Sequence, residues 1–391
     1  MLSSARRTLV ARPAQGTESR RPEGRAPDPF PTPVPASQAA AEPAPAPAAR
    51  RVPRRLPCRV PRGTARWGGL AALGCVLLLA VAASLGIGAE HIPPGRVAAG
   101  LLHPDGSRDA LIVQELRLPR TLLGLAVGAA LGLAGAVMQA LTRNPLAEPG
   151  LLGVNGGAAL AVVLVIGTFR TDEALVYVWA AFAGAAATAA LVYLIGARGR
   201  GGASPARLVL AGAAVNAVCT ALTAGLMLLS PRAFNGFRFW QVGSLGGRDL
   251  AVLARVLPFV VAGTVLALLL ARPLNALGLG EETGRALGAR PAAVRALGAL
   301  AVVLLCGSAT AAAGPIAFLG LAVPLIARAL TGPDQRWVLP YSLLLAPVLL
   351  LGADVLGRVV APGELETGIV TAFLGAPLFM LMVRRGRTRG L

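Results

Sequence analysis

The chain has 391 residues, of which 55% are hydrophobic and only 14% are charged, whereas a soluble domain carries about 25% charge. With a mean hydropathy of +0.66, it has too few charged side chains to cover a water-soluble domain. It contains no lysine. This excludes a Walker A phosphate loop, a Schiff-base enzyme and a lysine nucleophile, because each requires an amine at a fixed position. If ATP drives this protein, another chain must bind it.

The formal charge of +19 divides between two parts of the chain. Residues 1–66 hold 13 arginines and four acids, and residues 67–391 hold 24 arginines and 14 acids. The arginines of the second part flank apolar segments. We therefore interpret them as loop charge and expect no nucleic-acid partner.

The first 66 residues have the composition of a disordered segment. They include 13 prolines, and such a segment cannot bury enough apolar surface to offset the entropy lost on ordering. We predict a disordered, positively charged cytoplasmic tail over residues 1–66. We expect no signal peptide, since the first apolar run begins only at Trp67.

From Trp67 onward, long apolar runs alternate with short loops rich in glycine, proline and arginine. A transmembrane helix needs about 20 mostly apolar residues, and ten runs come near that length. We predict an all-α, polytopic integral membrane protein whose ten-helix bundle occupies residues 67–391. The predicted spans are 67–88, 119–141, 150–168, 174–196, 207–229, 250–271, 293–313, 315–331, 338–358 and 368–383.

The arginines predict the orientation of these spans. An even number of spans places both termini on one side, and with the N-terminus inside, 27 arginines are inside and 10 are outside. The positive-inside rule then predicts a cell-membrane protein with both termini in the cytoplasm. The ten outward arginines require a separate explanation.

One predicted span carries a row of glycines. Gly124, Gly128 and Gly132 recur at intervals of four residues, which leaves one helix face without side chains. Another helix can then approach closely, so we predict a tight bundle with little room for a large passage within one chain.

The sequence indicates neither an active site nor a metal site. It has two histidines, and its four cysteines lie at least 17 positions apart, which matches no zinc or disulfide spacing. Motifs of soluble enzymes are missing, so we expect no catalytic residue, no metal and no cofactor. Asp354, the one acid inside an apolar run, lies four residues before Arg358. We expect an ion pair near the outer surface in preference to a proton site.

Two loops on the predicted cytoplasmic side are distinctive. Residues 143–157 contain two prolines and four glycines, which predict a tight irregular turn. Residues 274–288 are partly apolar but too short to span, and they predict one or two short amphipathic helices broken at glycines. From physics alone, a helix lying on the lipid surface and a segment that docks on a partner fit this loop equally well.

Five segments carry a resemblance to a known family. They lie in order between about residues 110 and 385 and read LRLPR, GAVMQALTRNPLAEPGLLGVNGGA, LNALGLGEETGRALG, GPIAFLGLAVPLIAR and TGIVTAFLGAPLFMLMVRR. Together they resemble the FecCD-type permeases of ABC importers for iron siderophores, haem and cobalamin. The resemblance implies a ten-helix permease that pairs with a second copy or a close homologue. It also implies cytoplasmic ATP-binding subunits and a substrate-binding lipoprotein on the opposite side.

The resemblance further implies roles for individual residues. The outer-face arginines that would receive glutamates of the binding protein are Arg117, Arg120 and Arg358. Guanidinium suits this task because it pairs with carboxylate in a bidentate manner, and anchoring to lipid headgroups is the alternative. The segment that would couple to the ATPase comprises Leu279, Gly280, Glu281, Glu282, Ala286, Leu287 and Gly288.

Three amides are candidates for lining the substrate path, namely Gln139, Asn144 and Asn155. Amides inside a membrane more often join helices by hydrogen bonds, so both interpretations stay open. One position departs from the family pattern, because Glu366 and Thr367 replace a proline and a small apolar residue before the last span. We expect the span to survive, since an acid in the first turn favours a helix start.

Our hypothesis is that this chain forms the translocation pathway of an ABC importer for a large iron chelate, a ferric siderophore, without an ATP site of its own. A haem or cobalamin permease is the alternative within the family, because no residue separates these substrates. An ion-coupled secondary transporter is the alternative from another class. It predicts buried acids or repeats with broken helices.

Overall fold

In the computed structural model, the described residues are 63–88, 90, 92–103, 106–169, 173–197, 205–286, 288, 290–360 and 364–384. They form helices joined by turns, with no β-strand among them. The first helix begins at Gly63, within the last residues of the range predicted as a tail. The prediction of disorder over residues 1–62 lies outside the described residues.

The helices follow one another along the chain with short connections. In order they are α1 (Gly63–Gly86), α2 (Pro94–Leu102), α3 (Arg108–Leu111), a π-helical stretch (Ile112–Arg117), α4 (Leu118–Thr142), a 3-10 turn (Pro149–Leu152), α5 (Val154–Phe169), α6 (Ala174–Ala197), α7 (Pro205–Leu229), α8 (Pro231–Val242), α9 (Leu250–Leu269), α10 (Ala271–Gly278), α11 (Glu281–Ala286), α12 (Pro291–Ala313), α13 (Leu319–Thr331), α14 (Gln335–Val360) and α15 (Thr367–Arg384).

A helix occupies each of the ten ranges predicted as spans. Among the described residues, seven helical segments are long and apolar enough to cross a membrane, and three apolar helices are shorter. The shorter ones are Val154–Phe169, Leu319–Thr331 and Thr367–Leu381. The prediction of an all-α, multi-pass membrane protein is therefore confirmed.

Two of the shorter helices follow irregular segments that fold into the bundle. Residues 143–153 precede α5 and residues 314–318 precede α13. The two segments lie close together. The Glu148 carboxylate accepts a hydrogen bond from the Phe318 backbone, and a Cβ on Gly320 would lie 3.0 Å from Pro149. Irregular backbone is tolerated in a membrane protein where it is buried in protein, and Ala147, Pro149, Leu152 and Gly153 of the first segment and Gly314 and Ile316 of the second are buried.

Three helical segments fall outside both the predicted spans and the short helices predicted over residues 274–288. They are α2, α8, and the α3 and π-helical extension that lengthens α4 to a continuous segment of 35 residues. Ser107 and Ser230 cap α3 and α8 by accepting hydrogen bonds from the backbone N–H groups three residues later, Ala110 and Ala233, at 3.3 and 3.2 Å. Such short helices lack the long apolar run that identifies a span.

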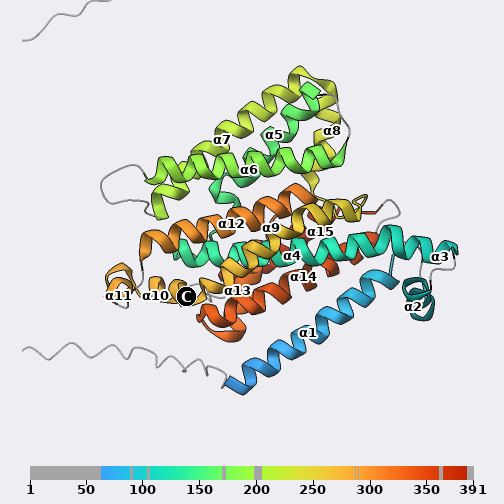
Figure 1. The fold of residues 1–391 in the computed structure, drawn as a ribbon, viewed down its shortest axis with the longest axis horizontal. Helices are drawn as coiled ribbons and strands as arrows, with labels where there is room; N and C mark the ends of the chain where they lie inside the picture. Colours follow the sequence, from blue (N-terminus) through green and yellow to red (C-terminus); the bar gives the residue numbers. More distant parts are fainter. Residues whose placement is uncertain are drawn as a thin grey trace, which may run out of the picture. The chain divides into compact units, whose positions relative to one another are not determined.

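The glycine row of α4 forms a close helix contact, as predicted, and its partner is α14. A Cβ on Gly128 would lie 2.6 Å from Pro347 Cα, and one on Gly132 would lie 2.6 Å from the Ser342 carbonyl oxygen. α4 also packs against α12, α13 and α9 (Figure 1). It is the central helix of the bundle.

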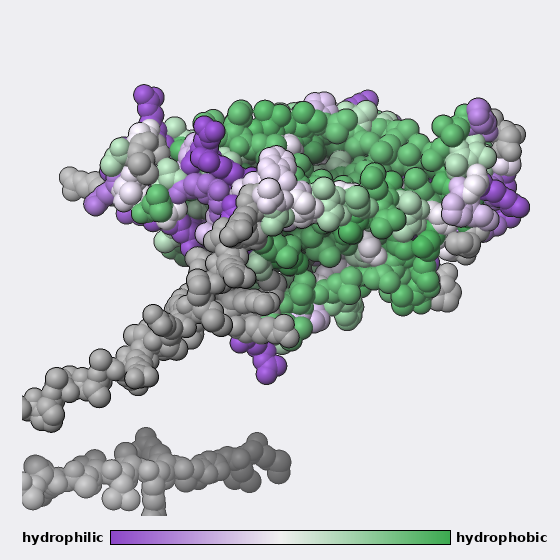
Figure 2. Space-filling model, turned by 90° about the horizontal axis from the view of Figure 1, so that it is seen from below, coloured by the Kyte–Doolittle hydropathy of each residue, from purple (hydrophilic) through white to green (hydrophobic). Residues whose placement is uncertain are grey.

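The surface has an apolar belt between two polar ends. Figure 2 shows hydrophobic residues over the middle of the visible face and hydrophilic residues at either end. Large apolar side chains that a soluble chain would bury are exposed, among them Leu78, Leu79, Leu210, Leu222 and Val261. A contiguous exposed apolar surface of this kind marks contact with lipid or with another protein.

The glycine contact predicts the response to one added methyl group. Gly128→Ala places a Cβ against the α14 backbone, and such overpacking costs about 1–3 kcal/mol. Gly352→Ala on α14 is the control, because nothing lies within 4 Å of its Cβ. Thermal unfolding of the purified chain in detergent should show a clearly lower melting temperature for Gly128→Ala and an unchanged one for Gly352→Ala. Equal melting temperatures would contradict the close contact.

Candidate functional site

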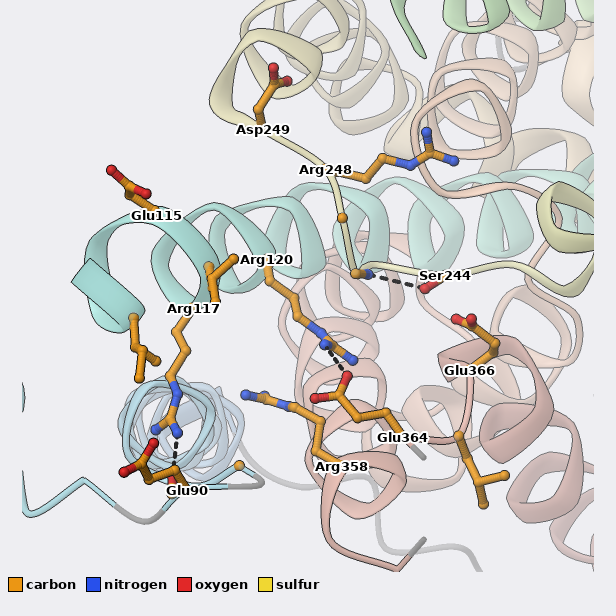
Figure 3. Close-up of a pocket in the computed structure, with 16 residues that line it drawn as sticks. Glu90, Glu115, Arg117, Arg120, Ser244, Arg248, Asp249, Arg358, Glu364 and Glu366 are labelled. Carbon is orange, nitrogen blue, oxygen red and sulfur yellow. Dashed lines mark hydrogen bonds and ion pairs between the residues drawn. The ribbon is translucent and has the colours of Figure 1, made fainter. Parts of the chain in front are cut away.

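A charged cavity of about 820 Å³ lies at the end of the bundle that carries α2 and α3 (Figure 1). Its walls come from the start of α4, the loop after α8, the end of α14 and the segment before α15. The charged residues that line it are Glu90, Glu115, Arg117, Arg120, Arg248, Asp249, Arg358, Glu364 and Glu366 (Figure 3).

A fully buried carboxylate, Asp354 of α14, binds the arginines beside this cavity. Arg120 of α4 donates to it from Nη2 at 2.9 Å and from Nε at 3.0 and 3.1 Å. Arg358 Nη2 lies 3.0 Å from Asp354 Oδ2, and the Thr367 hydroxyl donates to Asp354 Oδ1 at 2.7 Å. The predicted ion pair with Arg358 is confirmed. Arg120 of α4, 234 positions away in sequence, and Thr367 at the start of α15 complete the network.

Other N–H groups of Arg358, together with N–H groups of Arg117, bind the C-terminal end of α1. Arg358 donates to the Ser84 carbonyl oxygen at 2.9 Å and to its hydroxyl at 3.0 Å. Arg117 donates to the Leu85 carbonyl oxygen at 2.8 Å and to the Glu90 carbonyl oxygen. The last carbonyls of a helix have no partner within the helix and form its negative end, so cations are favourable there. The two arginines therefore fasten α1 to α4 and α14.

The three arginines are largely covered by this chain itself. Arg117 and Arg358 are 6% and 5% exposed, and the Arg120 side chain is 12% exposed. Arg120 also pairs through Nη1 with Glu364 at 2.9 Å, and the Glu364 side chain is 47% exposed. In Figure 3 the Arg120 guanidinium reaches Glu364, the Arg117 guanidinium turns toward Glu90 and the Arg358 guanidinium lies between them, whereas Glu115 and Asp249 extend away.

Sequence reasoning assigned only the three arginines to this cavity and missed its five acids and Arg248. Glu364 and Glu366 lie just before α15, and Arg248 lies in the loop after α8; they reach the cavity because α15 packs against α14 and that loop packs against α4. Burial lowers the pKa of Arg248, and the carboxylates of Glu366 and Asp249 act in the opposite direction. Arg248 Nε is buried without a hydrogen bond.

The departure from the family pattern has a structural role. α15 begins at Thr367, so the last helix survives there as expected. The Thr367 hydroxyl supplies the hydrogen bond to Asp354, which a small apolar residue at this position could not make.

At the opposite end, residues 271–286 form the two short helices α10 and α11, broken at Gly280, whose φ is +113°. This confirms the prediction of short helices broken at glycines. Glu281 pairs with Arg295 of α12 and lies 3.5 Å from Arg285. Glu282, Ala286 and Gly288 are exposed, and Leu279 is 65% exposed. Leu287 lies outside the described residues.

The three amides make different contacts. Gln139 of α4 donates to the Leu321 carbonyl oxygen of α13 at 3.1 Å, and Asn155 of α5 accepts from the Thr310 hydroxyl of α12 at 3.0 Å. Both bonds join helices, as the alternative interpretation expects. Asn144 is exposed and accepts a hydrogen bond from Leu146 N at 2.9 Å. Among the described residues, no His, Cys, Asp and Glu side chains group together as a metal site requires.

Comparison with known proteins gives a consistent result. The FecCD transport family matches residues 76–385. The chain is 52% identical over 316 residues to the ferric enterobactin transport system permease protein FepD of Escherichia coli, covering 81% of this chain and 94% of that protein. It is 41% identical over 315 residues to the Fe(3+)-citrate import system permease protein YfmD of Bacillus subtilis, covering 80% and 93%. A solved structure of a metal-chelate type ABC transporter in an inward-facing conformation superposes with a TM-score of 0.72 at 28% identity, covering 82% and 99%.

We expect a large loss of stability when the buried Asp354 carboxylate is removed. Asp354→Asn removes the carboxylate paired with buried Arg358 and leaves Arg120 with Glu364 alone, and breaking a buried pair in this way costs about 3–5 kcal/mol. Glu364→Gln removes a half-exposed carboxylate from the same arginine and should cost less than about 1 kcal/mol. The comparison is made by thermal unfolding of both variants in the same detergent. Similar losses in the two would show that Asp354 is not the centre of the network.

Proposed function

The chain belongs to the FecCD transport family, and we propose that it is the membrane-spanning permease subunit of an ABC importer for ferric siderophores. The observation that carries the substrate class is the similarity, along nearly the whole of that protein, to a ferric enterobactin permease. The metal-chelate transporter with the same fold supports the same class.

The absence of lysine supports a division of labour between subunits. A chain without lysine has no Walker A loop, so ATP would be bound and hydrolysed by separate subunits at the cytoplasmic face. The permease would perform no chemistry itself. The purified chain alone should therefore have no ATPase activity.

We further propose ten spans with both termini in the cytoplasm. Seven segments are long enough by themselves. α5 and α13 would complete their crossings together with residues 143–153 and 314–318, and α15 would be the last span. The arginine distribution supports this orientation.

The substrate path would lie between two copies of the permease, or between one copy and a close homologue. The glycine contacts of α4 bring backbones within van der Waals contact, which leaves no wide passage along the centre of one copy. Asn144 is the amide best placed to line such a path, because it is exposed. The side chains of Gln139 and Asn155 are engaged with other helices.

The charged cavity would receive the substrate-binding protein, as the resemblance of this chain to the family implies. Arg117 and Arg358 would act mainly by holding the rim together, since their donors bind this chain. Arg120 offers the replaceable contact. Its partner Glu364 is half-exposed, and a carboxylate of the binding protein could take the place of Glu364 on the same guanidinium nitrogen.

The α10 and α11 segment would couple the permease to the ATPase. Glu281 fixes this segment to α12 through Arg295. Leu279, Glu282 and Ala286 are exposed, so they would make the contact. The exposed apolar and charged groups of one short segment resemble the mixed composition of a transient protein interface.

Substrate uptake provides the direct test of the proposed function. A strain that lacks this chain and every other siderophore permease should not import radiolabelled iron supplied as ferric enterobactin, and expression of this chain should restore import. Haem and cobalamin serve as control substrates and should not depend on the chain. Restored import of haem or cobalamin, with none of the siderophore, would overturn the proposed substrate class.

The coupling role predicts a specific effect of Glu282. Replacing an exposed charge at an interface costs up to about 1 kcal/mol, so Glu282→Gln should weaken association with the ATPase subunit several-fold and leave the melting temperature unchanged. Glu115→Gln, an exposed acid at the opposite end, is the matched control. Unchanged association and transport in the Glu282 variant would count against the coupling role.

A further inference from the structure

A second cavity, of about 690 Å³, lies at the end of the bundle that carries α10. Its walls come from the end of α4, from α10, from the last turn of α13 and from the turn before α14. The proposed function assigns α10 and Leu279 to the ATPase contact, and it gives no role to the other walls of this cavity.

Arg328 of α13 is the unusual group in its wall. The residue is only 7% exposed, it lines the cavity, and its guanidinium makes no hydrogen bond or ion pair with any described residue. Arg295 and Arg358 are buried to a similar extent, and each is paired with a carboxylate. A buried charge without a counter-ion costs several kcal/mol, so an anion bound in the cavity would stabilise Arg328, and the described residues do not supply one.

The other polar groups of the wall do not supply that anion. Asp334 is the one acid of the lining, and its Oδ1 accepts hydrogen bonds from Asn275 Nδ2 at 2.6 Å and Arg336 N at 3.0 Å. Arg143 adds a second positive charge at the rim. Oε1 of Gln139 and of Gln335 are buried without a donor, and unsatisfied polar groups beside a cavity indicate that it is occupied by water or ligand.

We propose that this cavity binds one anionic phospholipid, with the phosphodiester of the headgroup on Arg328. A guanidinium pairs with a phosphate through two parallel hydrogen bonds. The phosphate would neutralise the buried charge, and Arg143 would add attraction at the rim.

The walls favour a lipid over a free anion. Much of the lining is apolar, contributed by Ala140, Pro145, Leu274, Leu279 and Pro333, and this surface suits the glycerol backbone and the first part of an acyl chain. The volume is within the range of about 300–1,000 Å³ typical of small-molecule sites. Basic pockets between transmembrane helices on the cytoplasmic side are suited to anionic headgroups, and the proposed topology places this cavity there.

Retention of lipid by the purified full-length chain tests the proposal. Native mass spectrometry in detergent, with equal amounts of phosphatidylglycerol and phosphatidylcholine added, should show one phosphatidylglycerol retained per chain. Arg328→Gln should reduce this retention at least about tenfold, because a hydrogen bond to a charged group contributes about 1.5–3 kcal/mol. Arg336→Gln, an exposed arginine of the same end, should leave it unchanged. Equal retention of the two lipids, or equal loss in both variants, would overturn the proposal.

Two further measurements keep the result interpretable. Arg328→Lys preserves the positive charge but not the two parallel hydrogen bonds of the guanidinium, so lipid retention should fall less than with Arg328→Gln. This variant tests the proposal even where Arg328→Gln folds poorly. Displacement of the lipid by millimolar inorganic phosphate would identify the ligand as free phosphate and overturn the lipid assignment. If Arg328→Gln keeps its lipid but loses association with the ATPase, the missing counter-ion is a carboxylate of that partner, and the proposal fails.

Discussion

The close approach of α4 to α14 determines how both ends of this protein are built. Side chains three or four positions apart lie on one helix face, and along α4 one such face carries an uninterrupted series of functional positions. From one end to the other the series is Arg117, Arg120, Gly124, Gly128, Gly132, Gly135 and Gln139. The glycines bring the α14 backbone close enough that Arg120 can reach Asp354. The same face ends at Gln139, in the wall of the second cavity.

The buried charges beside the charged cavity add little stability when they are paired, but the loss of one partner costs much. Desolvation offsets most of the attraction within a buried ion pair, so such a pair adds little net stability compared with a well-packed apolar substitute. Losing one partner is costly, because the remaining charge stays buried. The Asp354 network therefore acts mainly as a constraint. It requires α4, α14, α15 and, through Arg117 and Arg358, the end of α1 to meet in one arrangement.

The sequence predicted the parts of the molecule that depend on local pattern. Long apolar runs located the helices, the glycine interval predicted a close contact, and the four-residue spacing predicted the pair of Asp354 with Arg358. The pairing of Arg120 with Asp354, 234 positions apart, could not be predicted, because nothing local distinguishes Arg120 from its neighbour Arg117. Arg328 looked like an ordinary flanking arginine, since burial is a property of the packed structure. The short lengths of α5 and α13 were hidden because residues 150–153 and 315–318, directly before them, are also apolar.

These contacts also constrain how the permease can move during transport. α4 packs along its whole length against α14, α12 and α13, and its glycines meet backbone that cannot shift locally. Bending α4 would open gaps in a densely packed interior, which loses dispersion contacts along both helices. A displacement started at α10 and α11 would therefore reach the charged cavity by movement of the bundle as a body. If two copies form the proposed pathway, each bundle would move as a body, and the contacts that change during transport would be those between the copies.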